Sequence, residues 1–386
     1  MNEGLSFTLT EEQEAYRRSV RQLVEDKIAH RAAEIDEADE YPWDIDELLV
    51  KNGFAGVSYP EEHGGAGGGA VELCLLVEEI ARASAGVSLI PAVNKLGATP
   101  VLLAGTDQQK RLVCEGITNG THRMSYCLTE PGSGSDAAAM RSRAVEDGDH
   151  WLLNGSKRFI TGAGAADLYT YFAVTDPDGE KGNNITAFLI GKDMEGFSLG
   201  RKEDKMGIRG SPTREVILDN CRVPKSAVIG EVGQGFAIAM RTLDFSRPGI
   251  AAQALGIAQG AFDFAVDYCS ERKQFGQPVS SFQGMQFMFA DMAMKIETAR
   301  LAVYRAAVAV DEGDGDVSYW AAIAKCYASD AAMSVTTDCV QALGGYGYVR
   351  EYPVERFMRD AKITQIYEGT NQIQRVVIAR KLFGSR

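Results

Sequence analysis

The chain lacks the patterns that hold a metal ion or a disulfide framework. Its four histidines lie far apart, and none is in an HxxxH or HxH spacing: His30, His63, His122 and His150. Its seven cysteines are odd in number, scattered and without a CxxC pair: Cys74, Cys114, Cys127, Cys221, Cys269, Cys326 and Cys339. These absences indicate reduced thiols and predict no metal site.

The chain also lacks a basic charge balance, a long apolar run and a leader segment. The net charge of −13 at pH 7 argues against sequence-independent nucleic-acid binding, which requires a basic footprint. Every apolar run is interrupted before the ~18 residues that a membrane span needs, so no span is expected. The opening MNEGLSFTLTEEQEAY resembles neither a secretory signal nor a transit peptide. We therefore expect a cytoplasmic protein.

The chain has enough hydrophobic residues, 45% of 386, to form a substantial core.

Residues 1–123 are expected to be helical. Thr10 and Gln13 form a capping box ahead of apolar residues at helical spacing, and a second helical stretch runs from Val71 to Ala83.

From residue 124 to about 232 the pattern changes to short β-like runs. They are separated by turn signals such as Asp147-Gly148 and Asn154-Gly155. No helical segment of useful length alternates with these runs, so a parallel βαβ sheet is not expected. Residues 124–232 are predicted to form a β domain, a small barrel or sandwich.

Helical periodicity returns in residues 233–386. One stripe, with alternating steps of four and three, has the spacing of a bundle helix: Met285, Phe289, Met292, Ile296, Ala299 and Val303. A further helix around Tyr319 to Leu343 is expected to stop at Gly344-Gly345, and a last one to run from Thr370 to Leu382. The predicted fold class is α+β, with three domains: helices, a β domain and a helical bundle.

Four segments could carry chemistry, and the first is YCLTEPGSGSDA, residues 126–137. Gly132, Gly134 and Ala137 match G-x-G-x-x-A, but no helix inside a βαβ unit follows, so a dinucleotide fold is rejected. The turn still offers backbone N–H groups and hydroxyls to an anion. An ordinary turn is the alternative.

The second and third segments are KRFITG and ERKQFGQPVSSFQGMQF. Phe159 and Thr161 could flank a planar ring, although a lone Phe in a strand is usually a core residue. Arg272 could pair with a pyrophosphate through its planar fork, although an arginine at a helix end can simply complement the helix dipole.

The fourth segment is QIYEGTNQIQR, residues 365–375. Thr370 and Asn371 are good N-caps, so a helix begins directly after a turn at Glu368-Gly369. By composition alone Glu368 is an exposed turn residue. A carboxylate on such a turn can also reach into a cleft as a general base.

Together these segments resemble the acyl-CoA dehydrogenase family, in order and along nearly the whole chain. YCLTEPGSGSD, FIT, the RKQFG and FQ pair, QALGGYGY and YEGTNQIQR carry the resemblance. It implies an N-terminal α-helical domain, a middle β-barrel domain and a C-terminal four-helix bundle.

The resemblance also implies site residues. FAD would be bound by Tyr126, Leu128, Thr129, Gly134, Ser135, Phe159, Thr161, Thr370, Asn371 and Gln372, and across a dimer contact by Arg272, Phe275, Gln283, Gln341, Gly344 and Gly345. The acyl-CoA substrate would be met by Ser135, Asp244, Phe245, Ser246, Arg247 and Gly369.

In the family's reaction, Glu368 would remove the α-proton of the thioester as a hydride leaves the β-carbon for flavin N5, giving the trans-2-enoyl-CoA. The enolate oxygen would be held by the Glu368 N–H and a flavin ribityl hydroxyl. Some relatives place the base at the position of Ser246, which cannot be a carboxylate base, so Glu368 is favoured. Phe159 stands where many members of the family have Trp, and Gln274 where several have Thr.

The resemblance further implies a homotetramer, an electron-transfer flavoprotein as electron acceptor and a role in β-oxidation. Leu89, Ile90 and Pro91 lie in the segment that floors the family's acyl pocket, and their bulk favours a short or branched acyl chain. Three alternatives stay open: a dehydrogenase of carrier-protein-bound acyl groups, a flavin oxidase or monooxygenase, and a subunit that has lost catalysis.

Overall fold

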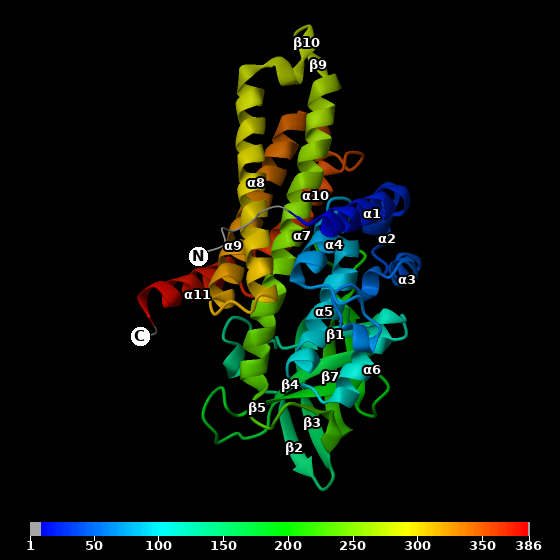
Figure 1. The fold of residues 1–386 in the computed structure, drawn as a ribbon, viewed down its shortest axis with the longest axis vertical. Coiled ribbons are helices and arrows are strands. Elements are labelled where there is room, and N and C mark those ends of the chain that lie inside the picture. The colour runs from blue at the N-terminus through cyan, green and yellow to red at the C-terminus, as the bar shows by residue number, and fades with distance from the viewer. Residues whose placement is uncertain (1–8, 385–386) are drawn as a thin grey trace.

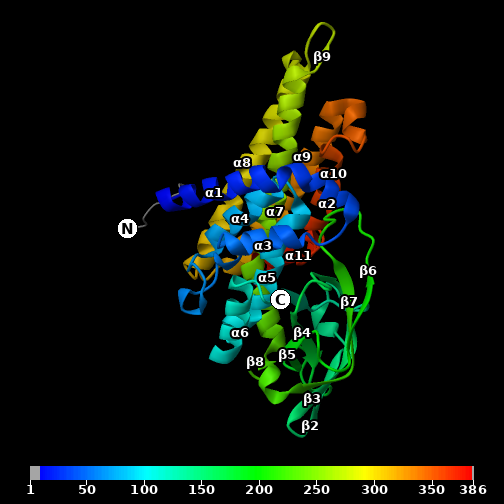
Figure 2. The same cartoon turned by 90° about the vertical axis from the view of Figure 1, so that its right-hand side faces the viewer.

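The computed structural model describes residues 9–384. Figures 1 and 2 show the β strands of the middle segment at one end, the N-terminal helices beside the middle, and long C-terminal helices running to the opposite end. This succession of helices, strands and helices confirms the predicted α+β class.

The N-terminal segment is helical, as expected. Thr10 caps its first helix, with Thr10 Oγ1 accepting from the Gln13 N–H at 3.1 Å and Gln13 Oε1 accepting from the Thr10 N–H at 3.1 Å. Val20, Val24 and Ile28 then face a buried cluster shared with Leu76 and Ile80. The helices are α1 (Glu11–Lys27), α2 (Ala32–Ala38), α3 (Trp43–Lys51), α4 (Ala70–Ala81), α5 (Ala85–Ala104) and α6 (Asp107–Thr118).

The middle segment forms one eight-stranded sheet in the order β6-β7-β3-β2-β4-β5-β8, with β1 paired to β4. Most pairs are antiparallel, and β1 runs parallel to β4. Side chains of β3, β4, β5 and β7 enclose one apolar cluster, as a barrel or sandwich requires. The strands are β1 (Met124–Cys127), β2 (Arg143–Asp147), β3 (His150–Thr161), β4 (Leu168–Val174), β5 (Ile185–Gly191), β6 (Phe197–Lys202), β7 (Thr213–Pro224) and β8 (Val228–Ile229).

The expected turn at Asn154-Gly155 is wrong. β3 runs without a break from His150 to Thr161, and its register against β7 shifts between Leu153 and Gly155. Gly155 has a φ of 152°, and a Cβ there would lie 2.3 Å from Ser142 Oγ. The glycine therefore serves a bulge with close backbone packing instead of a hairpin.

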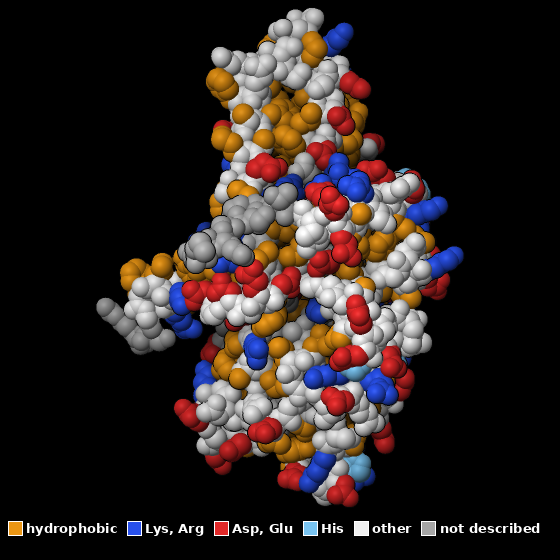
Figure 3. Space-filling view, in the orientation of Figure 1, with side chains coloured by type: hydrophobic (Ala, Val, Ile, Leu, Met, Phe, Trp, Pro, Cys, Tyr) orange, Lys and Arg blue, Asp and Glu red, His pale blue; other side chains and the backbone are white. Residues whose placement is uncertain are grey.

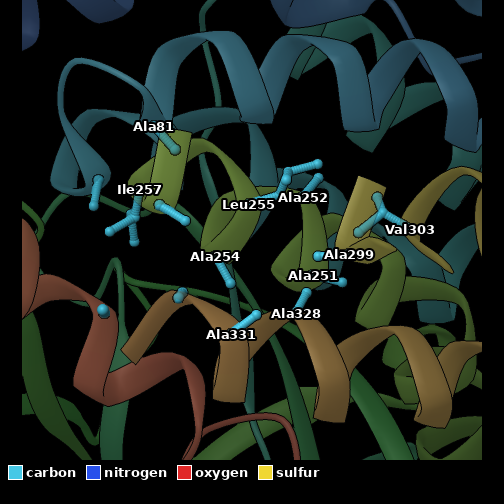
Figure 4. Packing of buried hydrophobic residues seen from close by; sticks show 14 of the residues in the cluster. Ala81, Ala251, Ala252, Ala254, Leu255, Ile257, Ala299, Val303, Ala328 and Ala331 are labelled. Atoms are coloured by element: carbon cyan, nitrogen blue, oxygen red, sulfur yellow. The ribbon is translucent and has the colours of Figure 1, made fainter. Parts of the chain in front are cut away.

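The C-terminal segment packs around α7, which is rich in small residues. Ala251, Ala252 and Ala254 of α7 face alanines of neighbouring helices in Figure 4. A Cβ on Gly260 would lie 2.1 Å from the Arg82 carbonyl oxygen, so glycine is required for that approach. The helices are α7 (Gly235–Glu271), α8 (Gln283–Asp311), α9 (Val317–Leu343), α10 (Val354–Thr364) and α11 (Asn371–Phe383), and a hairpin of β9 (Lys273–Gln274) and β10 (Gln277–Pro278) joins α7 to α8.

Two helices, α5 and α7, are long and apolar enough to cross a membrane by length and composition alone. Of their apolar windows, 67% and 72% are buried inside the protein, as in core helices. Their hydrophobicity is therefore accounted for by internal packing.

Candidate functional site

The turn between α10 and α11 carries the predicted base. Glu368 has a φ of 52° and Gly369 a φ of 90°, so two successive residues are left-handed. This conformation is unfavourable for a glutamate and persists only when its surroundings hold it. The Gln374 amide donates to the carbonyl oxygens of Glu368 at 3.1 Å and Gly369 at 2.9 Å, and Thr370 Oγ1 caps α11 by accepting from the Ile373 N–H at 3.3 Å.

The Glu368 side chain lies against α7, about three turns after the helix begins. Ser246 Oγ donates to Glu368 Oε2 at 2.6 Å, so the position that carries the base in some relatives faces this glutamate directly. Arg247 is buried beside it and pairs with Asp244 at 2.6 Å. Burial raises the pKa of Glu368 to about 7, against the opposing effects of Ser246, Arg247 and Lys325.

One cavity, of about 190 Å³, extends from Glu368 towards α5. Its walls are mainly apolar and come from α5, β1, α7 and the start of α11: Leu89, Ala92, Val93, Leu96, Tyr126, Met240, Leu243, Ile250 and Ile373. Leu89 lines it as predicted. Ile90 belongs instead to the apolar cluster under α1, and Pro91 is not among the lining residues.

A second cavity, of about 690 Å³, adjoins the first. The two share a wall made of Thr129, Gly134, Ser135, Phe159, Thr161, Tyr367, Glu368 and Gly369. Phe159 is 61% exposed at a φ of 57°, in a stretch where β3 shifts register against β7, so the bulge turns this ring outward.

The second cavity fits a flavin. The Phe159 ring offers a flat apolar face to this cavity, and four residues with hydroxyl groups also line the cavity: Thr129, Ser135, Thr161 and Thr370. Thr213 Oγ1 also lies in this lining and is buried without a protein partner among the described residues. A polar atom in that state calls for a bound partner.

The loop that carries Thr129 and Ser135 is held in place by hydrogen bonds from Lys157 of β3. Lys157 Nζ donates to Glu130 Oε1 at 2.8 Å and to the Leu128 carbonyl oxygen at 3.2 Å. The Glu130 carboxylate in turn accepts the N–H groups of Arg141 and Ser142. Although burial opposes it, Lys157 and these donors hold the pKa of Glu130 below its ordinary value.

The structure brings together only part of the predicted cofactor set. Six residues lie at the far end of the bundle, near the β9–β10 tip in Figure 1, and line neither cavity: Arg272, Phe275, Gln283, Gln341, Gly344 and Gly345. There the Arg272 guanidinium lies 5.2 Å from the Tyr346 ring centre, and Phe275 is 94% exposed.

Five further predicted residues line neither cavity: Asp244, Phe245, Ser246, Asn371 and Gln372. Asn371 is buried, and its amide is bonded to Lys325, Ser329 and Asp330. Gln372 is exposed on α11, and Phe245 lies beside Arg241 on α7.

Sequence reasoning missed Lys157, Glu130, Lys325, Gln374 and Thr213. A signal existed for Lys325, because it stands at an inward helical spacing from Ala321, Ala322 and Ala328.

Fold and cleft define the class. A helical domain, a β domain and a bundle enclose a cofactor-sized cavity, an apolar cavity and a carboxylate between them, as a flavin-dependent oxidoreductase with an acyl substrate requires.

The comparisons specify the family. Models of the acyl-CoA dehydrogenase N-terminal, middle and C-terminal domains match residues 10–121, 125–221 and 233–383. The probable acyl-CoA dehydrogenase FadE25 of Mycobacterium tuberculosis is 54% identical, over 97% of this chain and 96% of that relative. The short-chain-specific acyl-CoA dehydrogenase of Clostridium acetobutylicum is 46% identical, over 98% and 100%.

The structure of butyryl-CoA dehydrogenase from Megasphaera elsdenii superposes with a TM-score of 0.95 at 44% identity, over 98% of this chain and 100% of that one. The chain belongs to the acyl-CoA dehydrogenase family. It is an FAD-dependent oxidoreductase that acts on acyl-CoA.

Proposed function

We propose that Glu368 removes the α-proton of an acyl-CoA while the β-hydride goes to FAD, so that the product is the trans-2-enoyl-CoA. The observation that carries this proposal is the position of Glu368, which lines both the apolar cavity and the larger cavity. A base there reaches the same two carbon atoms that a flavin on the other side would face.

The protein groups around Glu368 suit proton abstraction. A carboxyl group with a pKa of about 7 is about half ionised at pH 7, so part of it is available as a base there, and its pKa is close to the pH at which it works. No protein acceptor among the described residues takes the Glu368 N–H, so it is free to donate to the thioester oxygen as negative charge develops there. Bound FAD supplies the hydride acceptor.

Cofactor binding is proposed for the residues of the shared wall and for the tip of a second subunit. Thr129, Phe159 and Thr161 would hold the flavin ring, and Ser135 would lie toward the pyrophosphate and the thioester. Arg272 and Phe275 of another copy would hold the adenosine half. Exposed apolar side chains on α8, Phe287, Met294 and Leu301, support a homotetramer, and Figure 3 shows hydrophobic side chains gathered over the upper bundle.

The substrate is proposed to have a short or branched acyl chain, and the enzyme to act in β-oxidation. The apolar cavity is about 190 Å³, and the bulky side chains of Leu89 and Leu96 are among those that line it. Relatives named for short-chain or butyryl substrates support this. Asp244 and Arg247 would meet the CoA portion.

An electron-transfer flavoprotein is the proposed acceptor. A chain in a structure described as electron transferring flavoprotein of Acidaminococcus fermentans has a TM-score of 0.96 and 47% identity over 99% of this chain. The cytoplasmic location expected from the opening residues stays a prediction. The proposed domain division at 123/124 and 232/233 is supported by the ranges that the family models match.

The test of the base is Glu368→Gln. We expect the variant to fold and keep its yellow FAD, and its flavin reduction by substrate in a stopped-flow single turnover to slow by at least about a hundredfold, because general-base catalysis is lost. Glu62→Gln, whose side chain is 78% exposed on a distant turn, is the matched control. Reduction of the Glu368→Gln flavin at the original rate would refute the assignment.

The acyl group is tested with C4 to C16 and branched acyl-CoAs and an artificial electron acceptor. An optimum at or near C4 supports the short-chain proposal, and an optimum at C12 or longer refutes it. Turnover of acyl-carrier-protein thioesters without turnover of any CoA ester would favour the carrier-protein alternative. A prolyl acyl carrier protein oxidase, 28% identical with a TM-score of 0.93, shows that such a substrate occurs on this fold.

A further inference from the structure

Lys325 of α9 contacts the turn that carries Glu368. Its side chain is fully buried, and Nζ donates to the Gly369 carbonyl oxygen at 2.7 Å and to Asn371 Oδ1 at 2.9 Å. Gly369 follows the base, and Asn371 begins α11. The lysine therefore ties α9 to both ends of the connection between the base and the last helix.

The ammonium group has no carboxylate of its own. In residues 9–384, no carboxylate oxygen lies within 4.0 Å of Lys325 Nζ, and both of its partners are neutral. Burying an ammonium without a paired anion is costly. Burial accordingly lowers the pKa of Lys325 to about 8, and the strongest opposing influence is the charge of Glu368.

Other charged groups near Glu368 come from several elements. On α7, Arg247 is already paired with Asp244. On β1, Tyr126 is partly buried and neutral, and its hydroxyl donates to the Ala239 carbonyl oxygen at 3.2 Å. Tyr367, the neighbour of the base in the chain, is bonded to Gln253.

The α9 and α11 sides complete this environment. Gln374 of α11 is uncharged, and on α9 Asp330 is paired with Arg375 at 2.7 Å. Cys326 donates to the Asn371 carbonyl oxygen. Lys325 is thus the cation near the base, among those named, whose charge no other carboxylate offsets.

We propose that Lys325 is a positioning residue for the reaction: it fixes the left-handed turn that aims Glu368 into the cleft, and its charge stabilises the ionised base. The proposal rests on the proposed role of Glu368. Two consequences are separable. The hydrogen bonds of Lys325 to Gly369 and Asn371 affect the rate of flavin reduction through the position of Glu368. The charge of Lys325 affects the pH at which Glu368 ionises.

The experiment compares Lys325→Met, which removes the donor and the charge, with Lys325→Gln, which keeps a shorter donor and removes the charge. Thr336→Val is the matched control, because Thr336 is buried on the same helix and bonds only within it. Each FAD-loaded variant is measured for flavin reduction rate against pH. The Glu368 carboxyl is also titrated by infrared difference spectroscopy without substrate, its band assigned by its loss in Glu368→Gln.

We expect Lys325→Met to slow flavin reduction about ten- to hundredfold, as misplacement of a catalytic group does. The acid limb of its pH profile and the infrared midpoint should both move to higher pH. Lys325→Gln should show the same direction of pH shift with a smaller loss of rate, and Thr336→Val should change neither.

Two results would overturn the proposal. One is an unchanged acid limb and infrared midpoint in both Lys325 variants. The other is an unchanged reduction rate in Lys325→Met. Because the infrared titration needs no turnover, it still decides the charge effect if Glu368 proves not to be the base, and Lys325→Gln carries the test if Lys325→Met fails to fold.

Discussion

Two fully buried lysines, Lys157 in the β domain and Lys325 in the bundle, stabilise two different segments that line the cleft, and they do so in different ways. Each donates to a backbone carbonyl next to a site residue, at Leu128 beside Thr129 and at Gly369 beside Glu368. Lys157 is also paired with Glu130 at 2.8 Å, whereas Lys325 has no such carboxylate among the described residues.

Lys157 therefore belongs to a structural ion pair, whereas the charge of Lys325 remains available to act on a reacting group. The Lys157–Glu130 pair is closed, meaning that both charges are satisfied within the protein: the Glu130 carboxylate also accepts hydrogen bonds from the backbone N–H groups of residues 141 and 142. A closed pair offsets its own burial cost and fixes a loop. The charge of Lys325 is left to act on Glu368, so its effect is expected mainly in the chemistry.

The largest effect is expected for Lys157→Met. The change leaves the Glu130 carboxylate buried without its cation, which should lower the free energy of unfolding by about 3–5 kcal/mol, measured by urea denaturation. FAD retention should fall with it, because the Thr129 loop loses its anchor. Lys325→Met should cost less, about 1–3 kcal/mol, since it removes two hydrogen bonds while the Gly369 carbonyl oxygen keeps the Gln374 amide and Asn371 Oδ1 keeps the Ser329 hydroxyl as donors.

The double variant Lys157→Met with Glu130→Gln is the control, and it should recover much of the lost stability. If Lys325→Met were the more destabilising single change, the distinction between the two lysines would fail.

A smaller effect is expected in the pH dependence of stability. The folded-state pKa of Glu368 is about 7, above its ordinary 4.5, so its contribution is fully present below about pH 4.5 and is lost as the pH rises through about 7. The loss is at most about 3 kcal/mol. Glu368→Gln should lack this decline, measured as the difference in urea unfolding free energy from wild type between pH 4.5 and 8.5.

Lys325→Met sharpens this prediction. Removing the cation should raise the pKa of Glu368 further, so the decline in stability that Glu368→Gln abolishes should become larger and extend to higher pH. A Glu368→Gln protein whose stability changes with pH as wild type does would show that Glu368 is not perturbed.

The smallest effect is expected for Ser246→Ala. It removes the hydrogen bond to Glu368 Oε2, and since that bond favours the charged form, the acid limb of flavin reduction should move to higher pH by about one unit or less. A matched stability measurement should change by only about 1 kcal/mol. A shift to lower pH would mean that Ser246 does not donate to the carboxylate.

Local signals were sufficient for several elements. The capping box at Thr10 and the N-cap at Thr370 both formed, because these side chains act on N–H groups within three residues. Glu368 was recognised as a candidate through the same N-cap and through the family resemblance. The helix α10 (Val354–Thr364) was missed.

Other features depended on distant partners. The Asn154-Gly155 dipeptide has the composition of a turn, yet the pairing of β3 with β7 and the approach of Ser142 made it a bulge. Ile90 is apolar like Leu89, and only the packing of α5 between two cores decided which of them reached the cavity.

By itself the sequence determined the order of helical and β segments, the helix beginnings and the turn that presents a glutamate before the last helix, since all of these arise from contacts a few residues apart. The tertiary structure decided what that glutamate can do. It placed Ser246, 122 residues away in the chain, and Lys325 around the turn, and it enclosed the carboxyl group between two cavities. Burial and charge at such a point depend on segments that meet only when the chain has folded.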